Sequence, residues 1–204
     1  MKPRTKRIIS YSLILIVAAF VVMRIAKKTN LNTEYQVGQV LDSLNNVYVY
    51  YNGGVDNVLE RNVSADGYNI GLKYQCVEFV KRYYYEHFNH KMPDSYGHAK
   101  DFFWKNLKDG KFNDKRGMNQ YHNGSSMKPA ADDLIVFGPS LSNSYGHVAI
   151  ISEVTDRDIE IVQQNPGPFG KSRERIALKK ENDRWSVDND RVLGWLRLPQ
   201  QQLD

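Results

Sequence analysis

The chain has 204 residues, of which 41% are hydrophobic and 25% are charged, a composition typical of one globular domain with some appended sequence. Its formal net charge of +5 comes from one end, because residues 1–28 hold seven basic residues and no acidic one, whereas the other 21 basic residues meet 23 acidic ones. The basic charge therefore gives no reason to expect a nucleic-acid partner.

Residues 8–23 (IISYSLILIVAAFVVM) carry no charge, and basic residues flank them on both sides. Together with Arg24, Ile25 and Ala26 they form an apolar stretch of about 20 residues, the length that a helix needs to cross a bilayer. Arg24 can reach the headgroups with its long side chain. No small-x-small cleavage site follows, so we predict a membrane anchor or uncleaved signal over residues 1–28. A cleaved signal peptide and a buried core helix are the alternatives.

The rest of the chain divides into a polar linker (29–36), one domain (37–199) and a short polar tail (200–204). Four basic residues precede the apolar stretch and three follow it, which favours a cytoplasmic N-terminus and a C-terminal domain on the exported side of the membrane. At the start of the domain, the spacing of apolar residues predicts a short helix over 37–44. A strand ended by a turn is expected over 48–54.

Residues 75–88 (QCVEFVKRYYYEHF) show helical spacing, with Val77, Val80, Tyr84 and Phe88 on one apolar stripe. Cys76, the only cysteine, begins this helix, where unpaired backbone N–H groups and the helix dipole stabilise a thiolate. The position predicts a thiol with a lowered pKa that acts as a nucleophile. A small buried hydrophobic residue is the alternative interpretation of a lone cysteine.

A second helix is predicted after Gly97 and is expected to end near Gly110, and a long polar segment, 111–131, is expected to form a surface loop beside a cleft. Strand patterns follow over 133–137, 147–154, 159–165, 175–180 and 193–198. Helices followed by an antiparallel sheet predict an α+β domain.

His147 begins one of these strands, so its ring can lie at the end of a buried strand, and histidine is the usual base for a cysteine nucleophile. The other histidines are weaker candidates. His87 and His90 form only a pair, which predicts no zinc site, while His98 and His122 lie in polar surroundings and are expected to be solvated.

The run QQN (163–165) lies at the end of the next predicted strand. A three-residue turn at 156–158 would set Ala149 opposite Gln163 and His147 opposite Asn165. Gln163 and Asn165 are then able to accept a hydrogen bond from imidazole Nδ1, which leaves Nε2 facing the thiol. Polar residues where a strand frays are the alternative.

The blocks YQCVEF, GHVAII and QQN together resemble the CHAP family (cysteine, histidine-dependent amidohydrolase/peptidase), a branch of the papain-like NlpC/P60 superfamily, with the amidase domain of glutathionylspermidine synthetase/amidase as the most similar branch. The resemblance spans residues 37–198 and implies a papain-like fold. It also implies Cys76 as nucleophile and His147 as base, with Gln163 and Asn165 as orienting residues. The family commonly has glutamate where Gln163 stands, and an amide can hold the ring but supplies no charge.

We therefore expect a membrane-tethered thiol hydrolase that cleaves amide or peptide bonds, in cell-wall peptides, through a thioester, with no cofactor and no metal. The backbone N–H of Cys76 is expected to bind the oxyanion, and Gln75 or Tyr74 to supply a second donor or bind substrate. A small-molecule amidase is one alternative. A catalytically weak CHAP domain that binds peptides is the other. The expected partners are a peptide or small amide and the membrane, and no nucleic acid.

Overall fold

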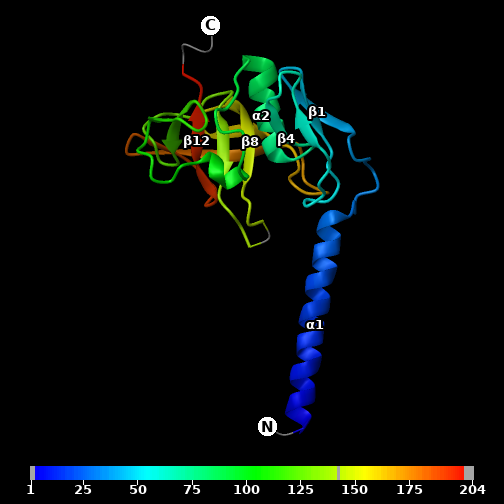
Figure 1. The fold of residues 1–204 in the computed structure, drawn as a ribbon. Coiled ribbons are helices and arrows are strands. Elements are labelled where there is room, and N and C mark those ends of the chain that lie inside the picture. Colours follow the sequence, from blue (N-terminus) through cyan, green and yellow to red (C-terminus); the bar gives the residue numbers. More distant parts are fainter. Residues whose placement is uncertain (1–2, 142, 200–204) are drawn as a thin grey trace.

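The computed structural model describes residues 3–141 and 143–199, so the predicted tail over 200–204 lies outside the described residues. Helix α1 (Pro3–Lys28) projects from the rest of the molecule as a single rod (Figure 1). Its residues Ile9–Lys28 have a mean hydropathy of 2.3, and none of this stretch is buried. The helix is long and apolar enough to cross a membrane, a test that a signal sequence also passes.

The segment between α1 and the first strand, predicted as a linker, lies against the body of the molecule. The Tyr51 hydroxyl donates to Asn30 Oδ1 at 2.7 Å, and Asn32 Nδ2 donates to the carbonyl of Pro168 at 3.0 Å. Asn32 is only 8% exposed. The junction between α1 and the domain is therefore folded rather than free.

Two small hairpins precede the helix that begins at Cys76. They are formed by β1 (Val40–Leu44) with β2 (Val47–Tyr50), and by β3 (Arg61–Val63) with β4 (Asn69–Leu72). The prediction of a helix over 37–44 is wrong. Asn45 and Asn46 both adopt positive φ angles, 48° and 66°, which form the two-residue turn typical of a hairpin.

Helix α2 (Cys76–Phe88) confirms the helix predicted over 75–88. Its apolar face is buried against the sheet, with Phe79, Val80, Tyr83 and Tyr84 at 0% exposure. Asn89 adopts the left-handed conformation (φ 50°) that commonly ends a helix. Because this face is buried, the helix cannot shift along the sheet, and the position of Cys76 at its N-terminal end is fixed.

The segment after Gly97 differs from the prediction. Only one short 3-10 turn, η1 (Ala99–Phe102), replaces the predicted second helix, and the expected surface loop contains β5 (Lys111–Asn113) and β6 (Met118–His122). The fully buried Gln120 explains the difference, because its amide bonds both the N–H and the carbonyl of Trp104 at 2.9 Å. This side chain satisfies backbone groups that a helix would otherwise have paired.

The largest sheet has eight antiparallel strands in the order β11-β10-β9-β8-β7-β12-β6-β5. The predicted strands appear as β7 (Leu134–Phe137), β8 (His147–Val154), β9 (Asp158–Val162), β10 (Arg173–Glu181) and β12 (Val192–Arg197), while β11 (Arg184–Val187) escaped prediction. The domain is a mixture of helix and sheet in which strands dominate. Because hairpins precede α2, the chain order is not simply helices followed by strands.

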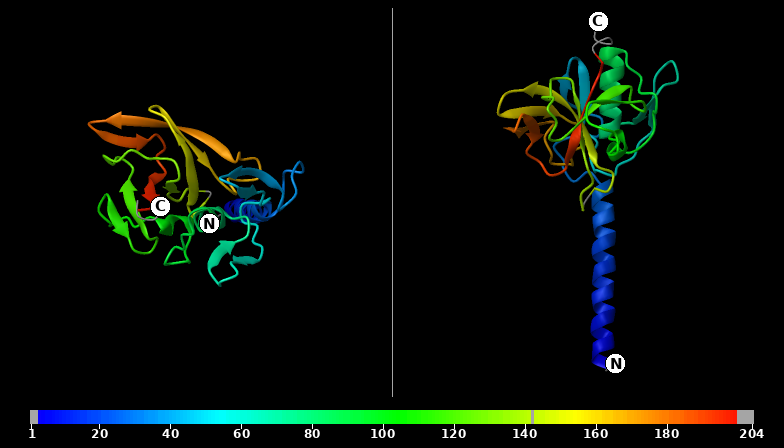
Figure 2. Two further views of the ribbon diagram at one scale, coloured as in Figure 1. Left: turned by 90° about the horizontal axis from the view of Figure 1, so that it is seen from above. Right: turned by 90° about the vertical axis from the view of Figure 1, so that its left-hand side faces the viewer.

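Successive residues of the central strands face opposite sides of the sheet. Val148 and Ile150 belong to the core that contains Phe79 and Val80 of α2, whereas Ala149 and Ile151 belong to a second core around Trp195. Helix α2 covers one side of the sheet (Figure 2). This packing brings the start of α2 to the start of β8.

Candidate active site

Cys76 is the first residue of α2 and is partly exposed. The chain reaches it through Tyr74, which has a positive φ of 65°, and Gln75, which is extended at the N-cap position. Backbone N–H groups of Cys76, Val77 and Val148 lie within hydrogen-bonding range of the sulfur and favour its thiolate. Since Val148 follows His147 directly, the sulfur lies beside the first residues of β8.

His147 is the first residue of β8, as predicted, and pairs across the sheet with Phe137. Its Nε2 lies 2.9 Å from Oε1 of Gln163. Gln163 is 5% exposed, and its own Nε2 donates to the carbonyl of Lys171 at 3.1 Å and to Glu174 Oε2 at 3.4 Å. These acceptors fix the orientation of the Gln163 amide, so its oxygen faces the imidazole.

The orientation of Gln163 assigns the tautomer of His147. An amide oxygen only accepts hydrogen bonds, so Nε2 of His147 carries the proton and Nδ1 is the nitrogen left free as a base. The prediction that Nδ1 donates and Nε2 stays free is therefore wrong. The side chain of Gln163 reaches the ring from beyond the end of β9, where strand pairing no longer sets the approach.

The predicted register of β8 and β9 agrees with the structure near the site, where Ile150 pairs with Val162. The strand ends at Val162, however, and Asn165 turns away with a φ of 57°. Its Nδ2 donates to the carbonyl of Val55 at 2.9 Å and to Gln75 Oε1 at 2.8 Å. Asn165 is therefore linked to the site by its hydrogen bond to Gln75, whereas Gln163 is the residue that bonds His147.

Gln75 and Tyr74, predicted to bind substrate or the oxyanion, already have intramolecular partners. Gln75 Nε2 donates to the carbonyl of Asn57 at 2.7 Å, and its backbone N–H donates to Leu72. The ring of Tyr74 lies 5.2 Å from that of Tyr50. Their role in binding substrate remains a prediction.

Gln164, to which the sequence pattern assigned no role, is fully buried between Gln163 and Asn165. Its Nε2 donates to the carbonyl of Gln75 at 3.0 Å and to Glu78 Oε2 at 2.9 Å, and its oxygen accepts from the Tyr50 N–H at 2.8 Å. Gln164 thus joins the loop after β9 to the start of α2. The alternation of side chains along a strand was the available signal, since it points Gln164 inward.

Burial controls the protonation of both reactive groups. It raises the pKa of the Cys76 thiol to about 11, although nearby backbone N–H groups act in the opposite direction. It lowers the pKa of His147 to about 4, opposed by the hydrogen bond to Gln163. The predicted lowering of the thiol pKa is therefore wrong, because desolvation outweighs the dipole of α2. At neutral pH both groups are uncharged.

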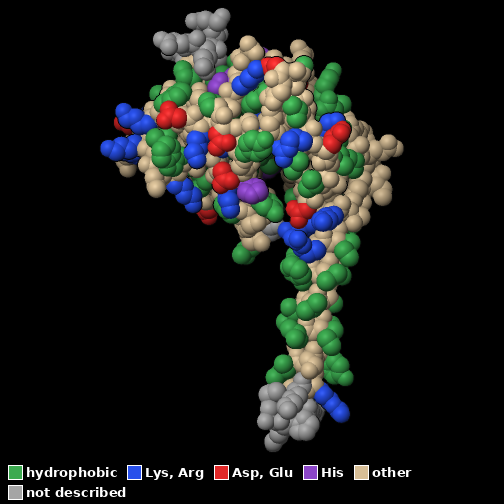
Figure 3. All heavy atoms as spheres, viewed as in Figure 1, with side chains coloured by type: hydrophobic (Ala, Val, Ile, Leu, Met, Phe, Trp, Pro, Cys, Tyr) green, Lys and Arg blue, Asp and Glu red, His purple; other side chains and the backbone are tan. Residues whose placement is uncertain are grey.

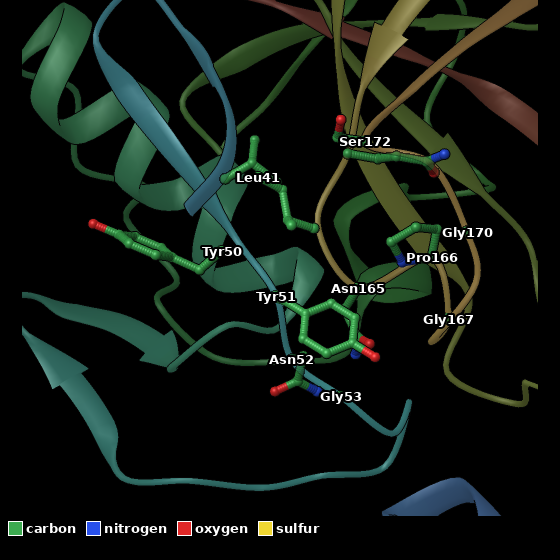
Figure 4. Close-up of a pocket in the computed structure, with 12 residues that line it drawn as sticks. Leu41, Tyr50, Tyr51, Asn52, Gly53, Asn165, Pro166, Gly167, Gly170 and Ser172 are labelled. Carbon is green, nitrogen blue, oxygen red and sulfur yellow. The ribbon is translucent and has the colours of Figure 1, made fainter. Parts of the chain in front are cut away.

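A hollow borders the site between β2 and the loop after β9 (Figure 4). Gln163 and Asn165 contribute to its lining. It adjoins an open groove of about 550 Å³ that runs past Tyr35, Leu41 and Phe169. Within the described ranges, no group of three or more His, Cys, Asp or Glu residues is arranged to hold a metal ion.

Residues 66–165 match the model of the CHAP domain. Trypanothione synthetase of Crithidia fasciculata is 32% identical over 151 residues, which cover 69% of this chain and 23% of that protein. Bifunctional glutathionylspermidine synthetase/amidase of Escherichia coli (strain K12) is 29% identical over 153 residues, which cover 69% of this chain and 24% of that protein. The chain spans about a quarter of the length of these relatives.

The crystal structure of the wild-type endolysin LysIME-EF1 is similar over 71% of this chain and 61% of that one, with 24% identity and a TM-score of 0.39. The structure of Ly7917 is similar over 51% of this chain and 39% of that one, with 19% identity and a TM-score of 0.32.

Proposed function

Because residues 66–165 belong to the CHAP domain family, we propose that this chain is a cysteine amidohydrolase in which Cys76 is the nucleophile and His147 the base. The main support for this proposal is the hydrogen bond from His147 Nε2 to Gln163. This hydrogen bond leaves Nδ1 of His147 free to accept a proton. The Cys76 sulfur lies beside the backbone N–H of Val148, the residue that follows His147. A nucleophile, a base and a group that orients the base are thereby combined.

In the proposed reaction, His147 Nδ1 takes the thiol proton as the sulfur attacks the amide carbon. The carbonyl oxygen becomes an oxyanion, and the backbone N–H of Cys76 in the first turn of α2 stabilises it. The C–N bond then breaks, and the leaving amine takes the proton from His147. Water, deprotonated by the same imidazole, hydrolyses the thioester and restores the thiol.

Gln163 supports this cycle by holding the ring. Its acceptor oxygen keeps the proton on Nε2 throughout, so that Nδ1 alone exchanges a proton with sulfur, amine and water. A neutral amide stabilises the imidazolium less than a carboxylate does. The carboxylate of Glu174 lies 3.4 Å from Gln163 Nε2.

For the location we propose that α1 anchors the chain in a membrane and that the catalytic domain lies on the exported side. The apolar length of α1 supports the membrane anchor. The slight excess of basic residues before the apolar stretch supports the orientation. Peptides of the cell wall are then the proposed substrates. A small amide such as glutathionylspermidine is the second candidate, favoured by the identity with glutathionylspermidine synthetase/amidase.

The test is to incubate the detergent-solubilised full chain with cell-wall peptide fragments and, separately, with glutathionylspermidine, and to identify the products by mass spectrometry. We expect a new free amine and a new carboxylate from the wall peptides, and no products with the Cys76→Ala variant. Cleavage of glutathionylspermidine alone would favour the small-amide activity. If neither is cleaved while the chain is folded, the domain is a binding module and the proposal is wrong.

A further inference from the structure

The last turn of α1 packs directly on the loop formed by residues 52–57. The N–H of Asp56 donates to the carbonyl of Lys27 at 2.8 Å. A Cβ on Gly54 would lie 2.4 Å from the same carbonyl oxygen, so the close approach requires glycine. The last turn of α1 is therefore in close van der Waals and hydrogen-bonding contact with the domain, next to the folded segment that contains Asn30 and Asn32.

The same loop forms one wall of the candidate site. Its Val55 carbonyl accepts from Asn165, and its Asn57 carbonyl accepts from Gln75, the residue before the nucleophile. Asn52 Nδ2 closes the loop on itself by donating to the Gly54 carbonyl at 3.0 Å. One short loop thus touches the end of α1 on one side and the site on the other.

The candidate site lies at the end of the domain from which α1 leaves, because the loop 52–57 contacts both. Both α2 and β8 begin toward that end, and the described parts of the loop between β7 and β8 extend toward the last turns of α1 (Figures 1 and 2). This loop presents Leu141 and Tyr145, the latter 49% exposed, and the loop after β9 presents Phe169 at 71% exposure. The loops that flank the site therefore carry exposed apolar side chains.

Basic side chains gather where α1 meets the domain, above its apolar length (Figure 3). When Ile9–Ala26 spans a bilayer, Lys27 and Lys28 lie at the headgroups, and the loop bonded to Lys27 lies there as well. Aromatic side chains such as Tyr145 and Phe169 are favoured at this depth. A docked junction also fixes the direction of the site, which a flexible linker would not.

We propose that the catalytic cleft faces the bilayer that holds α1 and acts on amide bonds carried by membrane-anchored molecules, close to the headgroups. The inference rests on the proposed function, namely an amidohydrolase anchored by α1. It adds a substrate class: a peptide or amide joined to a lipid by a short connection. Substrates held far above the surface meet the cleft less often, because the junction does not let the domain turn toward them.

The experiment uses the full chain in phosphatidylcholine–phosphatidylglycerol vesicles and one quenched fluorescent peptide amide in three forms. The peptide is dissolved, joined to a phospholipid by a short spacer, or joined by a long polyethylene glycol spacer. We expect the short-spacer form to be cleaved at least about tenfold faster than the long-spacer form. The dissolved form reports the chemistry alone.

Two insertion variants test whether the junction causes this preference. A twelve-residue Gly-Ser segment between Lys28 and Thr29 should leave the rate on dissolved peptide unchanged and make the short and long spacers equal. The same segment between Asn182 and Asp183, in the exposed turn that joins β10 and β11, should keep the tenfold preference.

An unchanged short-to-long ratio in the Lys28/Thr29 variant would overturn the proposal. So would a loss of cleavage of dissolved peptide in that variant, because the junction would then serve folding rather than placement. If the parental chain fails to cleave the dissolved peptide, the proposed amidohydrolase function itself fails, and this inference fails with it.

Discussion

Gln163 accepts a hydrogen bond from Nε2 of His147 at 2.9 Å while its own amide nitrogen is held by the carbonyl of Lys171. Replacing Gln163 by leucine removes the acceptor and releases the ring. We expect kcat to fall at least about tenfold with little change in KM, because the lost interaction orients the base rather than the substrate. Steady-state kinetics on a peptide amide measures both, and an unchanged kcat would show that Gln163 does not orient the imidazole.

The Gln163→Glu variant is a matched test of charge at the same position. A carboxylate beside His147 favours the imidazolium, so the pKa of the imidazole should rise from its buried value of about 4. The acidic limb of the kcat/KM profile should move to higher pH by the same amount. An acidic limb that stays in place would mean that the residue at 163 does not contact the base in solution.

Alkylation of Cys76 should follow the raised pKa of its thiol. Since burial raises this pKa to about 11, the rate with iodoacetamide should keep rising with pH through the alkaline range. The measurement is unambiguous because Cys76 is the only cysteine, and the Cys76→Ser variant gives the background. A plateau reached below about pH 8 would show a thiolate stabilised by the helix dipole and an imidazolium, contrary to this account.

Stability should also depend on the protonation of His147. Its pKa is about 4 in the folded chain and about 6.5 when unfolded, so the folded state binds fewer protons. The contribution is complete above about pH 6.5 and is lost as the pH falls through 4. We expect the urea midpoint of the parental chain to drop over this window more than that of His147→Gln. Parallel curves for both chains would rule out a buried neutral imidazole.

The buried ion pair between Glu78 and Arg82 in helix α2 should stabilise the folded state. Arg82 Nε donates to Glu78 Oε1 at 2.7 Å, and both side chains are less than 10% exposed. Arg82→Met leaves the Glu78 carboxylate buried without its cation, which we expect to cost about 3–5 kcal/mol of unfolding free energy. Urea denaturation measures the loss. Glu60→Gln, which breaks the exposed pair with Lys73, is the control and should leave the midpoint unchanged.

Flotation tests whether α1 is a retained membrane anchor or a cleaved signal. The full chain expressed with its N-terminus intact should float with vesicles and resist extraction by alkaline carbonate, because the apolar length of α1 matches a bilayer core. Recovery of a shortened chain in the soluble fraction would instead identify residues 1–28 as a cleaved signal.

The elements with strong periodicity could be predicted from the sequence, and these carry most of the site. Helix α2 and strand β8 show clear spacing, which placed Cys76 and His147 at adjacent ends. The short apolar stretch at 37–44 fits a helix or a strand equally well, and only the turn at Asn45 and Asn46 decides between them. Sequence alone also missed β5 and β6, which the buried amide of Gln120 links by accepting from Asn113 Nδ2 at 2.9 Å.

Details beyond the strand ends depended on contacts that sequence patterns do not contain. Asn165 leaves the ladder after Val162, so the predicted pairing with His147 does not extend to it. The nitrogen of His147 that is left without the proton follows from how Lys171 holds Gln163, a contact across a loop. The pKa of Cys76 depends on burial, which is a property of the packed fold rather than of the helix position.

The central claim is that Cys76 carries the acyl group between two steps assisted by His147. The most direct test is to quench a reaction with a peptide amide in acid and to search the tryptic peptide Tyr74–Lys81 for the acyl mass by mass spectrometry. We predict the adduct on Cys76 in the parental chain and its absence in Cys76→Ala. Continued turnover in Cys76→Ala, or an acyl group found on any other residue, would contradict it.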